Sequence, residues 1–114
     1  MARADDDMLL QEKLRFILQN SENSLSYGAL ARDLDVPRPG AIARVAAALE
    51  ATMRVDMAAG RPFIAAKCEG KLSGGLPALG FFQMAAALGR YTGPVDGPEA
   101  VAFVQQERRL LRSA

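Results

Sequence analysis

The sequence predicts a mainly helical α+β fold, because three features follow one another between Leu25 and Ile64. A short segment that starts with a helix-capping serine comes first. A turn that contains prolines and an alanine-rich segment with helical periodicity follow, and a strand-like stretch comes last. This order is typical of a helix-turn-helix followed by the first strand of a wing. We therefore expect a winged-helix-like domain with a small β-sheet or hairpin.

The size of the chain is that of one domain. It has 114 residues, of which 50% are hydrophobic, enough for one core without disulfides or metals. We expect a single domain over residues 1–114. The helix-turn-helix should cover about 26–54, the strand and loop about 61–78, and the C-terminal helices about 79–112.

The first helix should run from about Asp7 to Gln19. Four apolar side chains recur there at helical spacing: Leu10, Leu14, Ile17 and Leu18. Aspartates stand at its N-terminal end, where the helix dipole favours negative charge.

The helix-turn-helix begins at Ser26, a good N-cap for a helix that reaches about Leu34. Pro37 ends that helix because proline lacks the amide and restricts the residue before it. A third helix should follow from about Ala41 to Met53. An apolar stripe runs along it: Ile42, Val45, Ala46, Leu49 and Met53.

The second half of the chain should contain one strand and two helices. Residues 62–69 look like a strand, and residues 70–77, here called the glycine loop, form a flexible loop or hairpin tip. A fourth helix should span about Leu79–Leu88. Asp96 or Gly97 can cap the last helix, with a proline in its first turn.

The charge is distributed unevenly along the chain. The formal net charge is +1. Residues 1–25 carry three basic and five acidic side chains (−2), residues 26–71 carry seven and five (+2), and residues 72–114 carry four and three (+1). The small positive excess therefore lies on the helix-turn-helix. Proteins that depend on phosphate contacts usually carry a stronger basic stripe.

Several classes of protein are excluded by the composition. The chain has no histidine, and Cys68 is its only cysteine, which rules out imidazole catalysis, an internal disulfide and a cysteine metal cluster. No apolar run approaches the roughly 18–20 residues that span a bilayer. We expect a cytoplasmic protein that is not an enzyme, needs no cofactor or metal and does not bind membranes.

The candidate nucleic-acid contacts follow from the geometry of a helix-turn-helix, in which the N-terminal part of the second helix enters the major groove. Arg38 and Arg44 would contact DNA there, and Lys67 and Lys71 would contact phosphate from the wing. The remaining exposed face of the third helix is mostly alanine, which cannot read a donor–acceptor pattern. We therefore expect weak or shape-based binding. The alternative is that these are ordinary solvated charges.

Cys68 lies between Lys67 and Glu69. A neighbouring lysine could lower the pKa of an exposed thiol and make it reactive. The interpretation that we favour is a small apolar strand residue.

The glycine loop precedes a helix, so its amides could face a phosphate. It matches neither a Walker motif nor a dinucleotide fingerprint. We favour a hairpin tip whose following residues, Phe81 and Phe82, anchor the next helix. The C-terminal arginines at 108, 109 and 112 could touch phosphate or an acidic partner, although such residues more often form a solvated helix end.

The segment Tyr27-Gly28-Ala29-Leu30-Ala31-Arg32-Asp33-Leu34, with the proline turn and alanine-rich helix after it, resembles the winged-helix domain of alkylguanine-DNA alkyltransferases and alkyltransferase-like proteins. The resemblance covers roughly residues 25–55 and implies DNA binding. In that family a reactive Pro-Cys-His-Arg motif follows the recognition helix. This chain has Ala66-Lys67-Cys68-Glu69 in that region, so the resemblance gives Cys68 no nucleophilic role.

Two later segments, Arg61-Pro62-Phe63-Ile64 and Gly75-Leu76-Pro77-Ala78-Leu79-Gly80-Phe81-Phe82, resemble a family of small bacterial proteins that has no assigned function. That resemblance would cover most of residues 25–90 and implies no activity.

Two hypotheses on function lead. The first is a small DNA-binding or accessory regulatory protein in which Arg38, Arg44, Lys67 and Lys71 contact double-stranded DNA. The second is a protein–protein interaction module of the same fold, which the near-neutral charge and the alanine-rich helix favour. An enzyme acting through Cys68 or the glycine loop ranks last.

Overall fold

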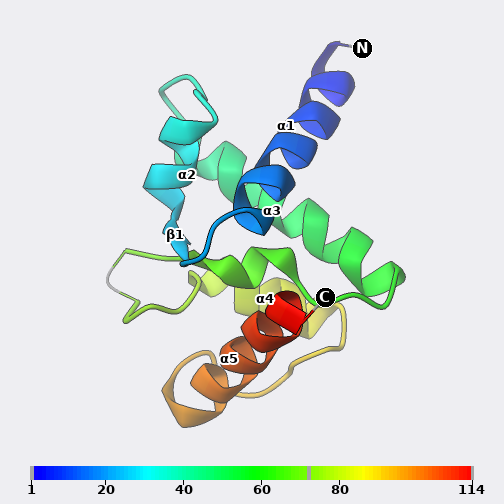
Figure 1. The fold of residues 1–114 in the computed structure, drawn as a ribbon, viewed down its shortest axis with the longest axis vertical. Helices are drawn as coiled ribbons and strands as arrows, with labels where there is room; N and C mark the ends of the chain where they lie inside the picture. Colours follow the sequence, from blue (N-terminus) through cyan, green and yellow to red (C-terminus); the bar gives the residue numbers. More distant parts are fainter. Residues whose placement is uncertain (1, 72, 114) are drawn as a thin grey trace.

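A computed structural model describes residues 2–71 and 73–113, and the side chains among them from residue 7 onward. Five α-helices, one 3₁₀-helix and two short strands follow one another within these residues (Figure 1). In chain order they are α1 (Ala2–Gln19), β1 (Leu25–Ser26), α2 (Tyr27–Asp33), α3 (Ala41–Ala58), η1 (Ile64–Lys67), β2 (Cys68–Glu69), α4 (Leu79–Ala87) and α5 (Gly97–Ser113).

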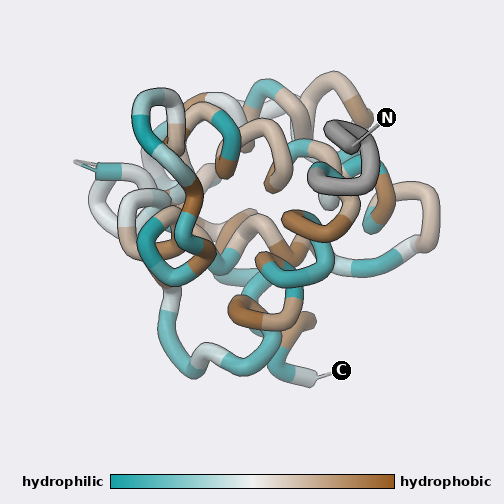
Figure 2. The backbone as a smooth tube through the Cα atoms, turned by 90° about the horizontal axis from the view of Figure 1, so that it is seen from above, coloured by the Kyte–Doolittle hydropathy of each residue, from teal (hydrophilic) through white to brown (hydrophobic). Residues whose placement is uncertain are grey.

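The helix α3 is the centre of the structure, because α1, α2, η1 and α4 all contact it. Its inward face is buried and contains Val45, Leu49 and Met53. From the other side α1 contributes Leu14 and Leu18, which are also fully buried. Apolar positions lie mainly on the helices, whereas the long peripheral loops are mostly polar or neutral (Figure 2). The mainly helical α+β class is therefore confirmed.

The sheet consists of β1 and β2 alone among the described residues. They pair in parallel, with Leu25 opposite Cys68 and Ser26 opposite Glu69. This pairing joins the start of the helix-turn-helix segment to the glycine loop. The strand expected over residues 62–69 is wrong for most of its length, because residues 64–67 form η1 and only Cys68 and Glu69 form β2. The structure shows no hairpin wing in the described part of the chain, since β2 is followed by a loop and α4.

Two buried carboxylates fix the residue at which this 3₁₀-helix begins. Asp56 of α3 accepts a hydrogen bond from the Ile64 amide at 3.0 Å, and Glu107 of α5 accepts one from the Phe63 amide at 2.9 Å. Acidic acceptors at a helical N-terminus satisfy amides that have no partner within the helix. The start of η1 is therefore fixed by groups from two distant helices.

The other elements agree closely with the expected ones. The Ser26 hydroxyl accepts a hydrogen bond from the Ala29 amide at 3.0 Å, which confirms it as the N-cap of α2. The helix α1 extends to Ala2 rather than beginning near Asp7, and α3 continues to Ala58 rather than ending near Met53. The helices α4 and α5 begin where the sequence predicts, and Phe81 and Phe82 anchor α4 in the core.

Candidate nucleic-acid interface

The chain reverses direction in a tight turn between α2 and α3, at the residues expected to face DNA. The Val36 amide donates to the Ala31 carbonyl at 3.1 Å, which closes the end of α2. Gly40 is the N-cap of α3 and has φ 86°, a left-handed conformation in which glycine is least strained. The two helices pack on one another across this turn.

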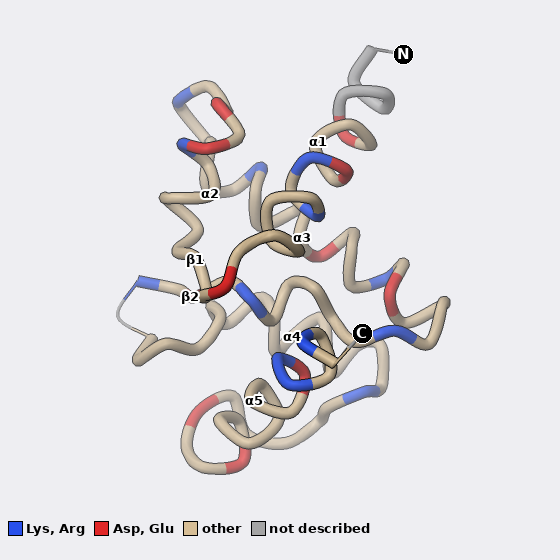
Figure 3. The backbone as a smooth tube through the Cα atoms, viewed as in Figure 1, with Lys and Arg blue, Asp and Glu red and all other residues tan. Residues whose placement is uncertain are grey.

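A groove of about 1180 Å³ opens between this turn and the glycine loop. One side consists of α2, the turn and the first residues of α3, and the other consists of residues on and around the glycine loop. Three cationic side chains line it: Arg32, Arg38 and Lys71. Asp35 and Glu69 also line it, so the excess charge is one positive unit. Figure 3 shows basic positions on the turn after α2 and on the loop after β2, at the same edge of the molecule.

The groove thus brings together two of the four candidate contacts, Arg38 and Lys71, which are 33 positions apart in the sequence. Both are exposed. Arg32, which also lines the groove, was not among the residues singled out from the sequence. Its position in the last turn of α2 is the signal that could have indicated it, because that turn leads into the proline turn.

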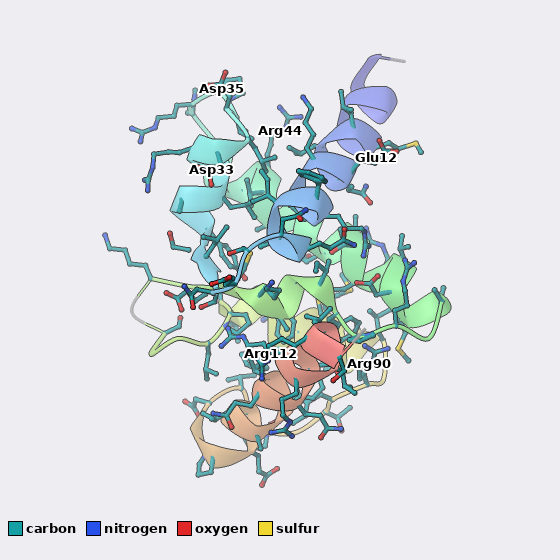
Figure 4. All side chains as sticks on the ribbon, in the orientation of Figure 1. Glu12, Asp33, Asp35, Arg44, Arg90 and Arg112 are labelled. Carbon is teal, nitrogen blue, oxygen red and sulfur yellow. The ribbon has the colours of Figure 1, made fainter. Side chains whose placement is uncertain are left out.

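Arg44 lies on α3 outside the lining of this groove. It faces the first half of α1, where its guanidinium is 3.7 Å from the carboxylate of Asp7. The side chains of Arg44 and Asp7 are 48% and 55% exposed, so the pair is a weak surface contact. Figure 4 shows Arg44 at the end of the molecule that carries the start of α1. It remains accessible to a ligand that approaches the N-terminal half of α3.

Lys67 does not point outward as a wing residue would. Its ammonium donates hydrogen bonds to the Leu18 carbonyl at 2.6 Å and to the Ser21 carbonyl. These acceptors lie in the last turn of α1 and just after it, where carbonyls lack helical partners. Burial, together with the nearby charge of Arg112, lowers the pKa of Lys67. Lys67 therefore caps α1, which corrects its expected role as an exposed phosphate contact.

The glycine loop is a compact turn rather than a hairpin tip. The Gly70 amide donates to the Leu76 carbonyl at 2.8 Å, and the Leu76 amide donates to the Ser73 carbonyl at 3.1 Å. Lys71 is exposed at the start of this turn. Below the loop, Arg108 of α5 donates to three carbonyls, so the structure does not leave this arginine as a solvated helix end.

Cys68 is fully buried in β2. Burial raises the pKa of its thiol to about 12, and the nearby Arg108 only partly opposes that effect. At neutral pH the side chain is therefore a protonated thiol without access to solvent, which is the opposite of a reactive cysteine. This agrees with the interpretation as a small apolar strand residue.

Three ion pairs around two buried carboxylates support the scaffold. The Asp56 carboxylate is fully buried and lies 2.9 Å from the Arg15 guanidinium and 3.3 Å from that of Arg61. Glu107 pairs with Arg90 at 2.9 Å, and the Arg90 guanidinium also lies 4.0 Å from the centre of the Phe63 ring. Each carboxylate has an amide of residue 63 or 64 as a further partner, so both are engaged in holding η1.

None of the helices in the described part of the chain combines the length and apolar content that crossing a bilayer requires. Comparisons with known protein families, with curated proteins and with solved structures find no match to this chain.

Proposed function

We propose that this protein binds double-stranded DNA weakly and with little sequence specificity, through the groove and the neighbouring N-terminal half of α3. One observation carries the proposal. Arg32, Arg38 and Lys71, from three separate segments, line a single groove at the start of a long helix. Phosphate is the part of DNA that such an arrangement contacts, because cations bind it without reading a base.

The N-terminal half of α3 offers few groups that could read bases. Ala43 and Ala47 are exposed there and can at most touch a thymine methyl group. Arg44 is the one exposed side chain among residues 41–49 with a base-reading guanidinium. Removing it should weaken binding, with a small effect on sequence preference.

The experiment is fluorescence anisotropy of a random labelled duplex across a series of salt concentrations. Three phosphate contacts give a slope of about −2.7 for log K against log salt, and each lost contact reduces its magnitude by about 0.9. The double variant Arg38→Ala/Lys71→Ala should therefore show a slope near about −0.9. Arg54→Ala is the matched control, because Arg54 is an exposed arginine on the later half of α3.

A second candidate function, docking of a protein partner, is favoured by the apolar part of the same groove. Ile42 is 55% exposed at the start of α3, and Ile42, Val36 and Ala31 all line the groove. Ile42→Ser separates the two candidates. It should leave DNA affinity unchanged within about twofold if phosphate is the ligand, because an isoleucine side chain makes no ionic contact.

A further inference from the structure

The guanidinium of Arg108 lies directly under the glycine loop. Its Nε donates to the Ala66 carbonyl at 2.7 Å, and its Nη2 donates to the Gly75 carbonyl at 2.9 Å and more weakly to the Cys68 carbonyl at 3.4 Å. Ala66 and Cys68 precede the loop, whereas Gly75 lies near its end. A single side chain from α5 therefore bridges the two ends of the loop.

This bridge has a geometry that other side chains cannot reproduce. The guanidinium presents donors in a rigid planar fork, so one group can bind carbonyls in different directions. A lysine has a single nitrogen at the end of a flexible stem. Arg108 is half-buried, and a charged hydrogen bond of this kind is stronger than one between neutral groups.

Other contacts anchor the residues that flank Lys71. Glu69 accepts a hydrogen bond from the Ser24 hydroxyl at 2.8 Å, Leu76 packs against the core, and the Ala78 amide just after the loop donates to the Tyr27 hydroxyl at 3.2 Å. Arg108 is the side chain that binds carbonyls on both sides of Lys71. Lys71 lies between these fixed points and is exposed. Its place in the groove, opposite Arg32 and Arg38, follows from where the ends of the loop are held.

We propose that Arg108 is a positioning residue for the candidate interface: by binding both ends of the glycine loop, it holds Lys71 across the groove from Arg32 and Arg38. The effect of Arg108 on DNA binding rests on the proposed function, whereas the effect of Arg108 on the loop does not. A cation held in place binds phosphate better than the same cation on a mobile loop, because less conformational freedom is lost on binding.

The first test measures the groove directly, without DNA. Spin labels are attached to the full chain at Arg32→Cys and Lys71→Cys, and the distance between them is measured by pulsed electron paramagnetic resonance. Cys68 is fully buried, so the labels attach to the two introduced cysteines. We expect a narrow distance distribution with Arg108 present and a wider or shifted distribution in Arg108→Lys and Arg108→Gln.

Arg109→Gln is the matched control, because this neighbouring arginine is exposed, and it should leave the distribution unchanged. If Arg108→Gln fails to fold by circular dichroism, Arg108→Lys carries the test. Unchanged mean and width in the folded Arg108 variants would overturn the inference.

The second test asks whether the loop position matters for DNA. Lys71→Ala should weaken duplex binding about five- to tenfold at low salt in the parent chain. In the Arg108→Lys background, which retains the charge, Lys71→Ala should weaken duplex binding less than about twofold. An equal loss in both backgrounds would contradict the positioning role. Absence of DNA binding in the parent would instead overturn the proposed function, and the distance measurement would still decide the role of Arg108.

Discussion

Asp56 offers the sharpest test of how the scaffold is held together. Its carboxylate is fully buried, accepts hydrogen bonds from Arg15 and from the Ile64 amide, and forms an ion pair with Arg61 at 3.3 Å. Asp56→Ala leaves the buried Ile64 amide without an acceptor, which costs about 1–3 kcal/mol, and removes the charged hydrogen bond from Arg15, which is worth about 1.5–3 kcal/mol. We therefore expect Asp56→Ala to lower the free energy of unfolding by about 3–5 kcal/mol.

Asp56→Asn should lower the free energy of unfolding by less, because the asparagine side-chain oxygen can still accept a hydrogen bond from the Ile64 amide although the charge is lost. Loss of charged hydrogen bonds is worth about 1.5–3 kcal/mol. For a chain of this size that corresponds to a fall in melting temperature of roughly 6–12 °C. Arg61 contributes little of this, because its side chain is 52% exposed, against 24% for Arg15.

The measurement is urea unfolding followed by circular dichroism at equilibrium. Asp33→Asn is the control, because this aspartate is exposed on α2, and it should change stability by less than about 0.5 kcal/mol. If Asp56→Ala, which removes the acceptor for the Ile64 amide, also stayed within that range, the idea that α3 fixes the start of η1 through this carboxylate would be refuted.

Three further predictions concern single side chains. Burial raises the pKa of Tyr27 to about 12, and its hydroxyl oxygen accepts from the Ala78 amide at 3.2 Å. Because the pKa of Tyr27 is higher in the folded than in the unfolded state, its contribution to the free energy of unfolding should be fully present below about pH 10 and be lost as the pH rises towards 12. Ultraviolet titration of the Tyr91→Phe variant, in which Tyr27 is the only tyrosine, measures this pKa. Cys68 should resist a thiol reagent at neutral pH in the native protein and react once urea unfolds it, since burial raises its pKa to about 12; reaction at the rate of a free thiol before unfolding would contradict its burial. Lys67→Met should lower the free energy of unfolding by about 1–2 kcal/mol through loss of the cap on α1 and leave the salt dependence of DNA binding unchanged; a reduced salt slope would instead restore Lys67 as a phosphate contact.

The elements that the sequence predicted well are those with local determinants. Ser26 caps α2 through a neighbour three residues on, and the apolar stripes of α1 and α3 are periodic along one helix. Such signals act within one or two turns and can be read directly from the sequence. The start of α5 at Gly97 belongs to the same class.

The errors lie where distant residues decide the local conformation. Residues 62–69 have the composition of a strand, but the amide of Phe63 is bound by Glu107, which is 44 positions away. Lys67 likewise finds its acceptors 46 and 49 positions earlier, in and after α1. Neither partner could be identified from the periodicity of the segment itself, because tertiary contacts override local propensity.

The sequence predicts only part of the candidate interface, because some of its residues are positioned by distant contacts. Arg38 and Lys71 were expected from their place in a helix-turn-helix and its wing, and the structure places both in one groove. The contribution of Arg108 could not be anticipated, because arginine near a helix C-terminus ordinarily indicates only a favourable interaction with the helix dipole.

The most direct test of DNA binding is the salt dependence of anisotropy with a random duplex, using the parent chain and Arg38→Ala/Lys71→Ala. We predict micromolar binding at low salt that weakens about 40-fold between 50 and 200 mM, with a much shallower dependence in the double variant. No binding of the parent chain at low salt, or binding that does not change with salt, would contradict a phosphate-binding groove and favour a protein partner at the same surface.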